Sequence, residues 1–328
     1  YFGEYGGVNP SISDSSTYTF ISAKTMFDTF EGNTEGCYLY SRHSSPSNLY
    51  LGEALAALEG TESANVTASG IGIKTTFLDI TDLDAVAKAM TSKTKMIYCE
   101  SVSNPLLEVA DISALSRIAK NNELPLVVDN TFSPLSVTPV KLGADIVIHS
   151  LTKFINGTSD CVAGVVCGTS EFCLSLKDVN NGAGMLLGST LDSLRAASIL
   201  KNMRTLHIRM KKHSENAMFL AENFEKDGLR VVYPGLPSHP GHLIMEDQMN
   251  HEYGYGGLVT MDVGTLENAN ALMELMQERK LGYLAVSLGF YKTLFSAPGS
   301  STSSEIPLDE QKEMGLGNGL IRFSIGLD

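Results

Sequence analysis

A single lysine stands between two apolar stretches at residues 144–168, ADIVIHSLTKFINGTSDCVAGVVCG. The lysine, Lys153, follows Ser150 and Thr152, and both flanking stretches have the β-branched composition of buried strands. A lysine held between two buried strands is costly unless it is paired or neutralised. A Schiff base with a carbonyl compound neutralises the amine and gives it a chemical role. The alternative is a solvated lysine at the end of a strand. The choice between these two interpretations depends on the other residues of the chain.

Other apolar strands also end in polar or small residues. Asp129 ends LVVD, Asn104 follows YCESVS, and Ser69 and Gly70 end TASG. Open α/β sheets bind their ligands at the carboxyl ends of strands. With Lys153, these ends offer an amine, a carboxylate, an amide and a small turn whose N–H groups can hold a phosphate. Pyridoxal phosphate requires this set of groups.

Each of these residues also has a purely structural interpretation. Asp129 can be a helix cap, Ser150 and Thr152 can cap a turn, and Asn104 before Pro105 is an ordinary turn pair. The prediction of a cofactor site therefore depends on the joint pattern and its order along the chain.

The pattern of apolar residues predicts an α/β fold. After an arm without clear periodicity, strands and helices alternate, which indicates a mostly parallel sheet covered on both faces. A long helical stretch follows, and then spaced strands with a helix between them indicate a smaller α+β domain. We expect an N-terminal arm at 1–44, a large cofactor-binding domain at 45–206 and a small domain at 207–328. The expected strands of the large domain are 64–70, 74–80, 95–101, 124–130, 145–150 and 162–168.

One connection does not fit a parallel sheet. The expected strands ANVTASG and KTTFLDI are joined only by IGI, whereas parallel neighbours need a crossover of about a dozen residues or more. We therefore infer that a mobile crossover segment is missing from the chain near Ile71 and Ile73, and we expect a break there.

Composition excludes several classes of protein. The chain has 328 residues, 43% of them hydrophobic, which is enough for a large core. Its net charge is −13 and no basic patch is visible, so nucleic acid and anionic membranes are poor partners. The apolar runs are too short to span a bilayer, and no signal peptide is evident. The five cysteines lack metal-ligand spacing, so we expect no metal and small buried thiols in the cytoplasm.

The sequence resembles the Cys/Met-metabolism pyridoxal phosphate enzymes, the transsulfuration group with fold type I. The resemblance covers almost the whole chain, and the lysine motif with its flanks is its most specific part. It implies a mostly parallel large domain, a smaller C-terminal α+β domain and a homo-oligomer, usually a tetramer. The matching stretches are YLYSRHSSPSNLYLGEALAALEG, TASGIG, YCESVSNPLLEVADI, LVVDNTFSPL, LGADIVIHSLTKFINGTSDCVAGVVCG, YPGLPSHP, AVSLG and GLIRFSIGLD.

The resemblance assigns a role to each matching residue. Lys153 forms the Schiff base and then moves protons, while Asp129 pairs with the ring nitrogen. Arg322 receives the substrate carboxylate as a bidentate partner. Asn104 and Ser287 complete that carboxylate site. The phosphate is held by Gly70, Ile71, Ser150 and Thr152, with Tyr40 and Arg42 reaching across from a neighbouring subunit. The family also carries a ring-stacking tyrosine, which would belong to the missing segment.

The residue before Ser287 bears on the substrate. Relatives that process cystathionine commonly have a glutamate there, and this chain has Val286. Valine favours a shorter, apolar side chain, and the stretch AVSLGFYKTLFSAPGSSTSSE resembles the methionine γ-lyase branch. The expected reaction converts methionine into methanethiol, 2-oxobutanoate and ammonia. Cystathionine γ-lyase, cystathionine γ-synthase or O-acylhomoserine sulfhydrylase activity is the alternative.

Interpretations from other classes fit less well. SLTK matches the S-x-x-K motif of serine acyl-enzymes, but TSDC lacks the asparagine of SDN and no KTG occurs. No G-x-G-x-x-G follows a strand, which argues against a dinucleotide enzyme. A non-catalytic binding module would be expected to lose Lys153 or Asp129, and both are present.

Overall fold

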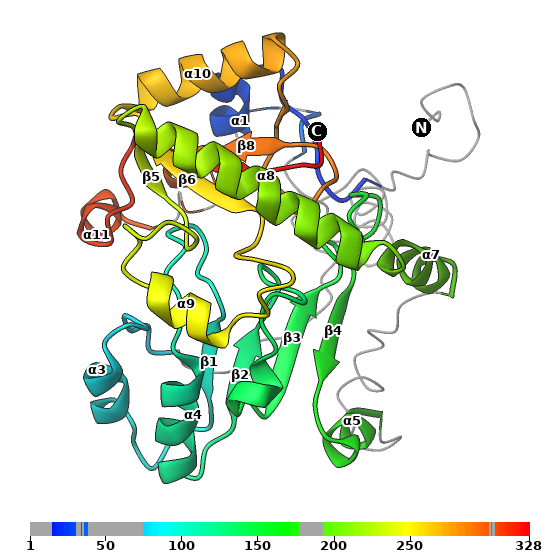
Figure 1. The fold of residues 1–328 in the computed structure, drawn as a ribbon, viewed down its shortest axis with the longest axis vertical. Coiled ribbons are helices and arrows are strands. Elements are labelled where there is room, and N and C mark those ends of the chain that lie inside the picture. Colours follow the sequence, from blue (N-terminus) through cyan, green and yellow to red (C-terminus); the bar gives the residue numbers. More distant parts are fainter. Residues whose placement is uncertain are drawn as a thin grey trace, which may run out of the picture.

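The computed structural model describes residues 15–30, 34, 36–38, 75–177, 193–301, 303 and 306–328. A four-stranded sheet and a five-stranded sheet organise this part of the chain (Figure 1). The four-stranded sheet has the order β1-β2-β3-β4. Its strands are β1 (Ile97–Glu100), β2 (Leu126–Asp129), β3 (Ile146–Ser150) and β4 (Gly164–Cys167).

The first three strands of this sheet are parallel. Glu100 pairs with Asp129, and Asp129 pairs with Ile148, so the carboxyl ends of β1, β2 and β3 meet at one edge. β4 is antiparallel to β3. The short stretch between β3 and β4 contains Lys153, which places the lysine at this edge of the sheet.

Two helices that accompany this sheet begin at aspartate caps. The side chain of Asp82 accepts a hydrogen bond from the Ala85 N–H at the start of α3 (Leu83–Lys88), over 2.8 Å. Asp111 does the same for the Ala114 N–H at the start of α4 (Ile112–Asn121), also over 2.8 Å. Each cap satisfies a backbone donor that the first turn of a helix leaves unpaired.

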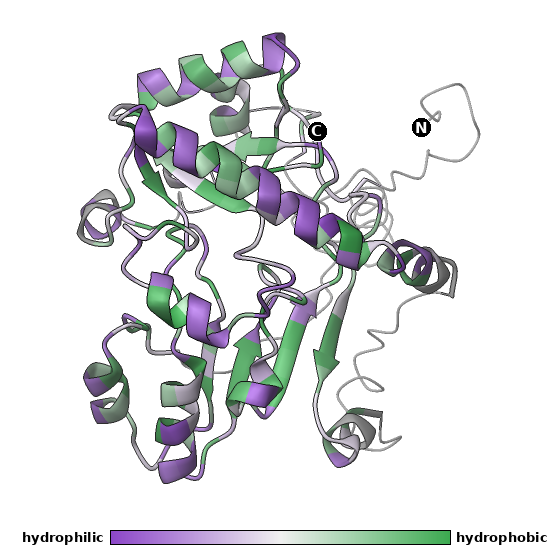
Figure 2. Cartoon of the chain, in the orientation of Figure 1, coloured by the Kyte–Doolittle hydropathy of each residue, from purple (hydrophilic) through white to green (hydrophobic). Residues whose placement is uncertain are grey.

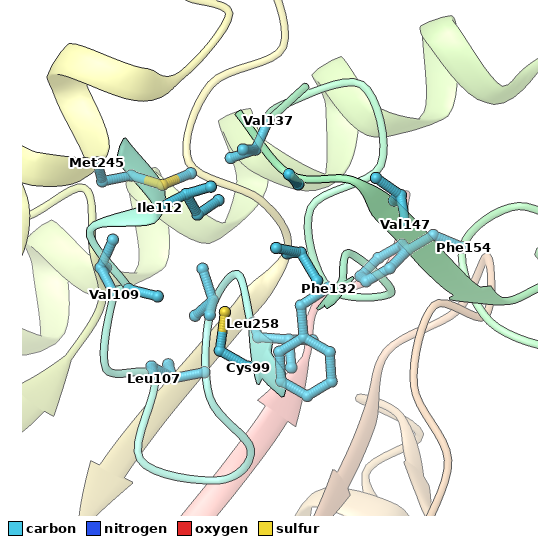
Figure 3. Close-up of a cluster of buried hydrophobic side chains, with 14 of the residues drawn as sticks. Cys99, Leu107, Val109, Ile112, Phe132, Val137, Val147, Phe154, Met245 and Leu258 are labelled. Atoms are coloured by element: carbon cyan, nitrogen blue, oxygen red, sulfur yellow. The ribbon is translucent and has the colours of Figure 1, made fainter. Parts of the chain in front are cut away.

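A large apolar cluster lies where this sheet meets its helices and neighbouring loops (Figure 3). Its residues include Cys99 of β1, Ile112 of α4, Val147 of β3 and Met245 of α9 (His242–Gln248). Phe154, directly after Lys153, is also in the cluster and has no exposed surface. The lysine is therefore anchored by a core residue at the next position of the chain.

The second sheet has the order β5-β6-β9-β8-β7. Its strands are β5 (Arg230–Val232), β6 (Leu258–Asp262), β7 (Tyr283–Leu284), β8 (Leu294–Ser296) and β9 (Leu320–Ser324). All of its pairings are antiparallel except that of β7 with β8. The sequence predicts spaced strands in this part of the chain, and the structure contains them. The long predicted helix is divided into α7 (Ser193–Met203) and α8 (Leu206–Lys226), and α8 packs on β5 and β6 (Figure 1).

The remaining elements are short or lie beside the second sheet. α10 (Leu266–Glu278) contacts both β7 and α1 (Ala23–Phe30). The other elements in the described ranges are α5 (Ser170–Lys177), α11 (Leu308–Glu313) and the 3-10 helices Pro139–Leu142 and Pro298–Ser300.

The hydropathy of the residues follows this arrangement of sheets and helices. Figure 2 shows hydrophobic residues concentrated on the strands of both sheets, and hydrophilic residues along much of α8. The buried positions of α8 include Leu206, Met210, Ala217 and Ala221, which recur at helical spacing. None of the helices in the described ranges has both the length and the apolar character needed to cross a membrane.

Two expectations about strands are wrong. The expected strand at 74–80 is irregular over residues 75–79, and Phe77 there is 90% exposed. An apolar run becomes a buried strand only where a partner strand pairs with it, and within the described ranges none does here. β4 forms as expected but is largely exposed rather than buried, because among the described strands it pairs with β3 alone, at the edge of the sheet. Its Cys167 is exposed, as is Cys37, against the expectation of buried thiols.

Other expectations fall outside the described residues. These are most of the arm at 1–44, the strand expected at 64–70 and the break expected at 71–73. The proposed division into domains at 1–44, 45–206 and 207–328 stays a prediction.

Candidate active site

The amine of Lys153 meets a hydroxyl from the second sheet. Lys153 is half-buried, and its Nζ donates a hydrogen bond to Ser287 Oγ over 2.9 Å. Ser287 follows β7 and is only 2% exposed. The end of β3 and the end of β7 therefore bring two of the predicted site residues into direct contact.

A glycine allows this close approach. Gly289 has a φ of +74°, and a Cβ at this position would lie 2.3 Å from the backbone nitrogen of Phe154. Its N–H donates to Ser324 Oγ over 2.8 Å. The loop that carries Ser287 thus lies directly against the backbone that carries Lys153, and only a residue without a side chain fits between them.

An arginine holds the same backbone from α8. The guanidinium of Arg209 donates to the carbonyl oxygens of Phe154 and Ile155, the two residues that follow Lys153. Arg209 is buried, so these hydrogen bonds are shielded from water and restrain the lysine segment.

Asp129 ends β2 at the edge where the strand ends meet. Its Oδ1 accepts a hydrogen bond from the Thr131 N–H over 2.9 Å, and its Oδ2 accepts one from the Tyr98 phenol over 3.2 Å. Glu100 is its neighbour across the parallel pair. Burial, together with the Asp129 charge, raises the pKa of Glu100, while the Glu100 carboxyl accepts from the Asn104 N–H over 2.8 Å.

Arg322 is a buried cation with an unused donor. It lies on β9, is 2% exposed, and donates from Nη1 to Asn104 Oδ1 over 2.7 Å. Its Nη2 donates to the carbonyl oxygens of Val286 and Ser287 over 3.3 and 3.4 Å, and its Nε is buried with no acceptor among the described residues. Burial lowers the pKa of Arg322 to about 10, so the guanidinium is still charged at neutral pH. A buried guanidinium with an unfilled donor suits an anionic ligand such as a carboxylate.

The two predicted phosphate-binding hydroxyls have different environments. Ser150 is half-buried, and its N–H donates to Thr131 Oγ1 over 2.8 Å. Thr152 is buried, and its hydroxyl donates to the Ala163 carbonyl and accepts from the Ala163 N–H. In this structure the Thr152 hydroxyl therefore joins the lysine turn to the residue just before β4.

The structure brings the predicted residues together in two pairs, Lys153 with Ser287 and Arg322 with Asn104. Asp129, Ser150 and Thr152 lie at the ends of the neighbouring strands β2 and β3 or just after them. Four further predicted residues lie outside the described ranges, namely Tyr40, Arg42, Gly70 and Ile71.

Sequence reasoning missed three groups around Asp129, which are Tyr98, Glu100 and Thr131. A signal for the first two exists in the parallel pairing of β1 with β2, since alternate residues of one strand share a face. Within the same described ranges, no three histidine, cysteine, aspartate or glutamate side chains come together to hold a metal ion.

The sequence matches the family model described as "Cys/Met metabolism PLP-dependent enzyme", over residues 3–73 and 71–328. A methionine gamma-lyase of Arabidopsis thaliana is 41% identical over 369 residues, covering 99% of this chain and 84% of the relative. That alignment is longer than the 328 residues of the chain, so the relative carries stretches that this chain lacks. The two matched pieces meet at residues 71–73, where the sequence predicts a missing crossover.

Solved structures give the same likeness. Cystathionine gamma-lyase from Lactobacillus plantarum, complexed with L-serine, superposes with a TM-score of 0.71 at 27% identity, covering 98% of this chain and 90% of that one. A putative O-acetylhomoserine (thiol)-lyase from Campylobacter jejuni gives a TM-score of 0.72 at 26% identity, covering 100% of this chain and 94% of that one. The latter contains a pyridoxyl-lysine phosphate group.

Proposed function

The chain belongs to the Cys/Met metabolism PLP-dependent enzymes, and from this premise we propose that it is a carbon–sulfur lyase of the methionine γ-lyase type. In this reaction L-methionine and water give methanethiol, 2-oxobutanoate and ammonia. The similarity to the methionine gamma-lyase of Arabidopsis thaliana, over nearly the whole chain, supports this choice of substrate.

The observation that carries the proposal is the pairing of two cationic groups with polar residues from the other sheet. Lys153, after β3, meets Ser287, and Arg322 of β9 meets Asn104, after β1. An amine and a guanidinium placed in this way suit an α-amino acid, because the guanidinium can fix the carboxylate while the amine acts at the carbon beside it.

The described residues fit pyridoxal phosphate. Lys153 provides the amine for a covalent link to the aldehyde, and Asp129 provides an anion for the ring nitrogen. When bound, the cofactor supplies the electron sink that makes loss of a proton beside the amino group possible. Ser150 and Thr152, with Gly70 and Ile71, are the proposed phosphate ligands.

Arg322 is the proposed receptor for the substrate carboxylate. Its buried Nε offers a hydrogen-bond donor to the carboxylate, and its charge offers a counter-ion. Asn104 accepts a hydrogen bond from the neighbouring Nη1. The carbonyl oxygen of Ser287 accepts a hydrogen bond from Arg322, and its hydroxyl accepts one from Lys153. Ser287 therefore links the proposed carboxylate site to the amine.

Lys153 is the proposed proton carrier. Its amine takes the proton from Cα of methionine and later one from Cβ. The bond between Cγ and sulfur then breaks, and the sulfur leaves with one of these two protons as methanethiol. The other proton is returned to Cγ, which becomes the methyl group of the product, and a proton then moves from the nitrogen to Cβ. Water replaces the amino group, so that ammonia and 2-oxobutanoate are released. A positioned acid–base group of this kind typically contributes about 10²–10⁴-fold in rate.

Val286 supports the preference for methionine. It is 7% exposed and apolar, and it directly precedes Ser287, so its side chain suits an uncharged thioether rather than the distal amino group of cystathionine. The alternative activities are those of cystathionine γ-lyase, cystathionine γ-synthase or O-acylhomoserine sulfhydrylase. The likeness to the two solved structures supports this second group.

We further propose a homo-oligomer, with a tetramer as the expected state, in which Tyr40 and Arg42 reach the phosphate of a neighbouring subunit. We place the enzyme in the cytoplasm. The structure records no disulfide among Cys37, Cys99, Cys161 and Cys167, which suits a reducing compartment.

The test is a paired measurement on the purified protein. An absorbance band at about 420 nm after addition of pyridoxal phosphate establishes that the protein binds the cofactor, because this chromophore belongs to the cofactor. Release of methanethiol from L-methionine, compared with release of cysteine from L-cystathionine, establishes the substrate. A protein with the band that cleaves only cystathionine would replace the proposed function by its alternative, and a protein without the band would contradict both.

A further inference from the structure

Two side chains of β1 share the face of the sheet that carries Asp129. Tyr98 and Glu100 are alternate residues of this strand, and Cys99 between them points into the core. Because β1 and β2 are parallel with Glu100 opposite Asp129 and Tyr98 opposite Val127, the phenol lies diagonally across from the Asp129 carboxylate.

Each oxygen of Asp129 is held by a separate donor. The Tyr98 phenol donates to Oδ2 over 3.2 Å, and the Thr131 N–H donates to Oδ1 over 2.9 Å. One donor comes from the neighbouring strand and the other from the turn that follows β2. A carboxylate has about four lone-pair positions, so each oxygen can still accept from a further group.

We infer that Tyr98 is a positioning residue for the proposed lyase, holding the Asp129 carboxylate in the orientation in which it meets the ring nitrogen of the cofactor. The inference rests on the proposed function. Tyr98 itself acts through Asp129 and does not take part in the reaction.

The chemistry of the neighbouring groups fits this role. Burial, with the charges of Asp129 and Glu100 nearby, raises the pKa of the Tyr98 phenol, so the phenol stays protonated and remains a donor. Glu100 is occupied elsewhere, since its carboxyl accepts from the Asn104 N–H. Tyr98 is the side chain of β1 whose hydrogen bond to Asp129 is seen in the structure.

The hydroxyl can be removed without disturbing the core. Tyr98 is 53% exposed, so Tyr98→Phe deletes one donor and leaves the ring. The matched control is Tyr283→Phe, because Tyr283 belongs to the other sheet and contacts Phe290 and Lys292 rather than Asp129.

The experiment measures the affinity for pyridoxal phosphate of the apoprotein and its variants, by titration at the cofactor's visible band. We expect Tyr98→Phe to weaken binding about three- to tenfold, the range that corresponds to the net contribution of a typical intramolecular hydrogen bond, and Tyr283→Phe to bind like the parent. The same comparison in an Asp129→Asn background forms a double-mutant cycle. There the effect of Tyr98→Phe should shrink to less than about twofold, which a general loss of stability would not do.

Visible circular dichroism of the bound cofactor gives a second measurement. A reoriented Asp129 should change the ellipticity per bound cofactor in Tyr98→Phe, even if the Asp129→Asn protein binds too weakly for the cycle. Unchanged affinity and unchanged ellipticity in Tyr98→Phe would overturn the inference while leaving the proposed function intact. Failure of the parent protein to bind the cofactor would instead overturn the proposed function.

Discussion

Lys153 Nζ and Ser287 Oγ lie 2.9 Å apart, although 134 positions separate them in the chain. Lys153 follows a strand of the four-stranded sheet and Ser287 follows a strand of the five-stranded sheet. The lysine therefore points toward the second sheet, where Arg322 is buried on β9. Any change that separates these two segments should separate the amine from the proposed carboxylate site.

Replacement of Gly289 tests this close approach. In Gly289→Ala, the new Cβ would meet the backbone of Lys153 and Phe154 at 2.3–2.8 Å, and the residue would keep an unfavourable φ of +74°. We expect a loss of about 2–4 kcal/mol in the free energy of unfolding from overpacking and strain together. Activity should fall by more than the loss of stability alone would cause, because Ser287 moves away from Lys153. Denaturant unfolding and steady-state kinetics measure the two effects.

Gly228→Ala is the control for the backbone strain alone. Gly228 has a φ of +80°, and a Cβ added there would meet nothing within 4 Å, so only the cost of the positive φ remains, about 1 kcal/mol. Equal losses of stability and activity in the two variants would show that the contact between Gly289 and the lysine segment has no role.

Arg322→Lys keeps the charge but removes the planar donor pair. A lysine cannot fix a carboxylate in the bidentate manner of a guanidinium. We expect kcat/KM for methionine to fall about 10- to 100-fold, mainly through KM, while the visible band of the cofactor is kept. The control is Arg230→Lys, since the Arg230 side chain is 84% exposed and pairs with Asp262. A KM equal to that of the parent protein would remove Arg322 from substrate binding.

His213 should make the stability of the protein depend on pH. It is fully buried, its Nδ1 hydrogen-bonds the Ile325 carbonyl over 2.6 Å, and its ring packs edge-on against Phe154. Burial lowers the pKa of His213 from 6.5 to about 4. Between pH 6.5 and about pH 4, the unfolded chain therefore binds a proton at His213 that the folded protein does not bind. The stabilisation that comes from burying the neutral ring is complete above pH 6.5 and is lost as the pH falls toward 4.

The loss attributable to His213 is on the order of 3 kcal/mol, at about 1.4 kcal/mol for each pKa unit. Urea unfolding at about pH 7, above this range, and at about pH 4.5, near its lower end, should therefore show a smaller difference in His213→Gln than in the parent protein. His251→Gln, at an exposed position, should behave like the parent. The assignment fails if the two variants have the same pH dependence.

The sequence predicts much of the large sheet because its signals are local. The helices that begin after Asp82 and Asp111 have aspartate caps, and the strand that ends at Asp129 has a continuous apolar run. Local signals do not report whether a neighbouring strand exists. The expected strand at 74–80 is irregular over its described residues, and the expected missing crossover immediately before it coincides with the junction of the two family matches.

The site is predicted less completely, for a similar reason. Motif and resemblance name Lys153, Ser287 and Arg322, and the structure places the first two in contact. Tyr98 carries no motif, and its contact with Asp129 depends on the register between two strands. Gly289 likewise matters only because a distant backbone lies against it. Such relations between separate segments become visible only once the chain is folded.

The measurement that tests the role of Lys153 most directly is reduction of the protein with borohydride in the presence of pyridoxal phosphate, followed by peptide mass analysis. We predict a pyridoxyl group on Lys153 of the parent protein. In Lys153→Ala we predict no such group and no methanethiol release. A modified lysine elsewhere in the parent protein, or turnover of methionine in Lys153→Ala at the parent rate, would contradict this role.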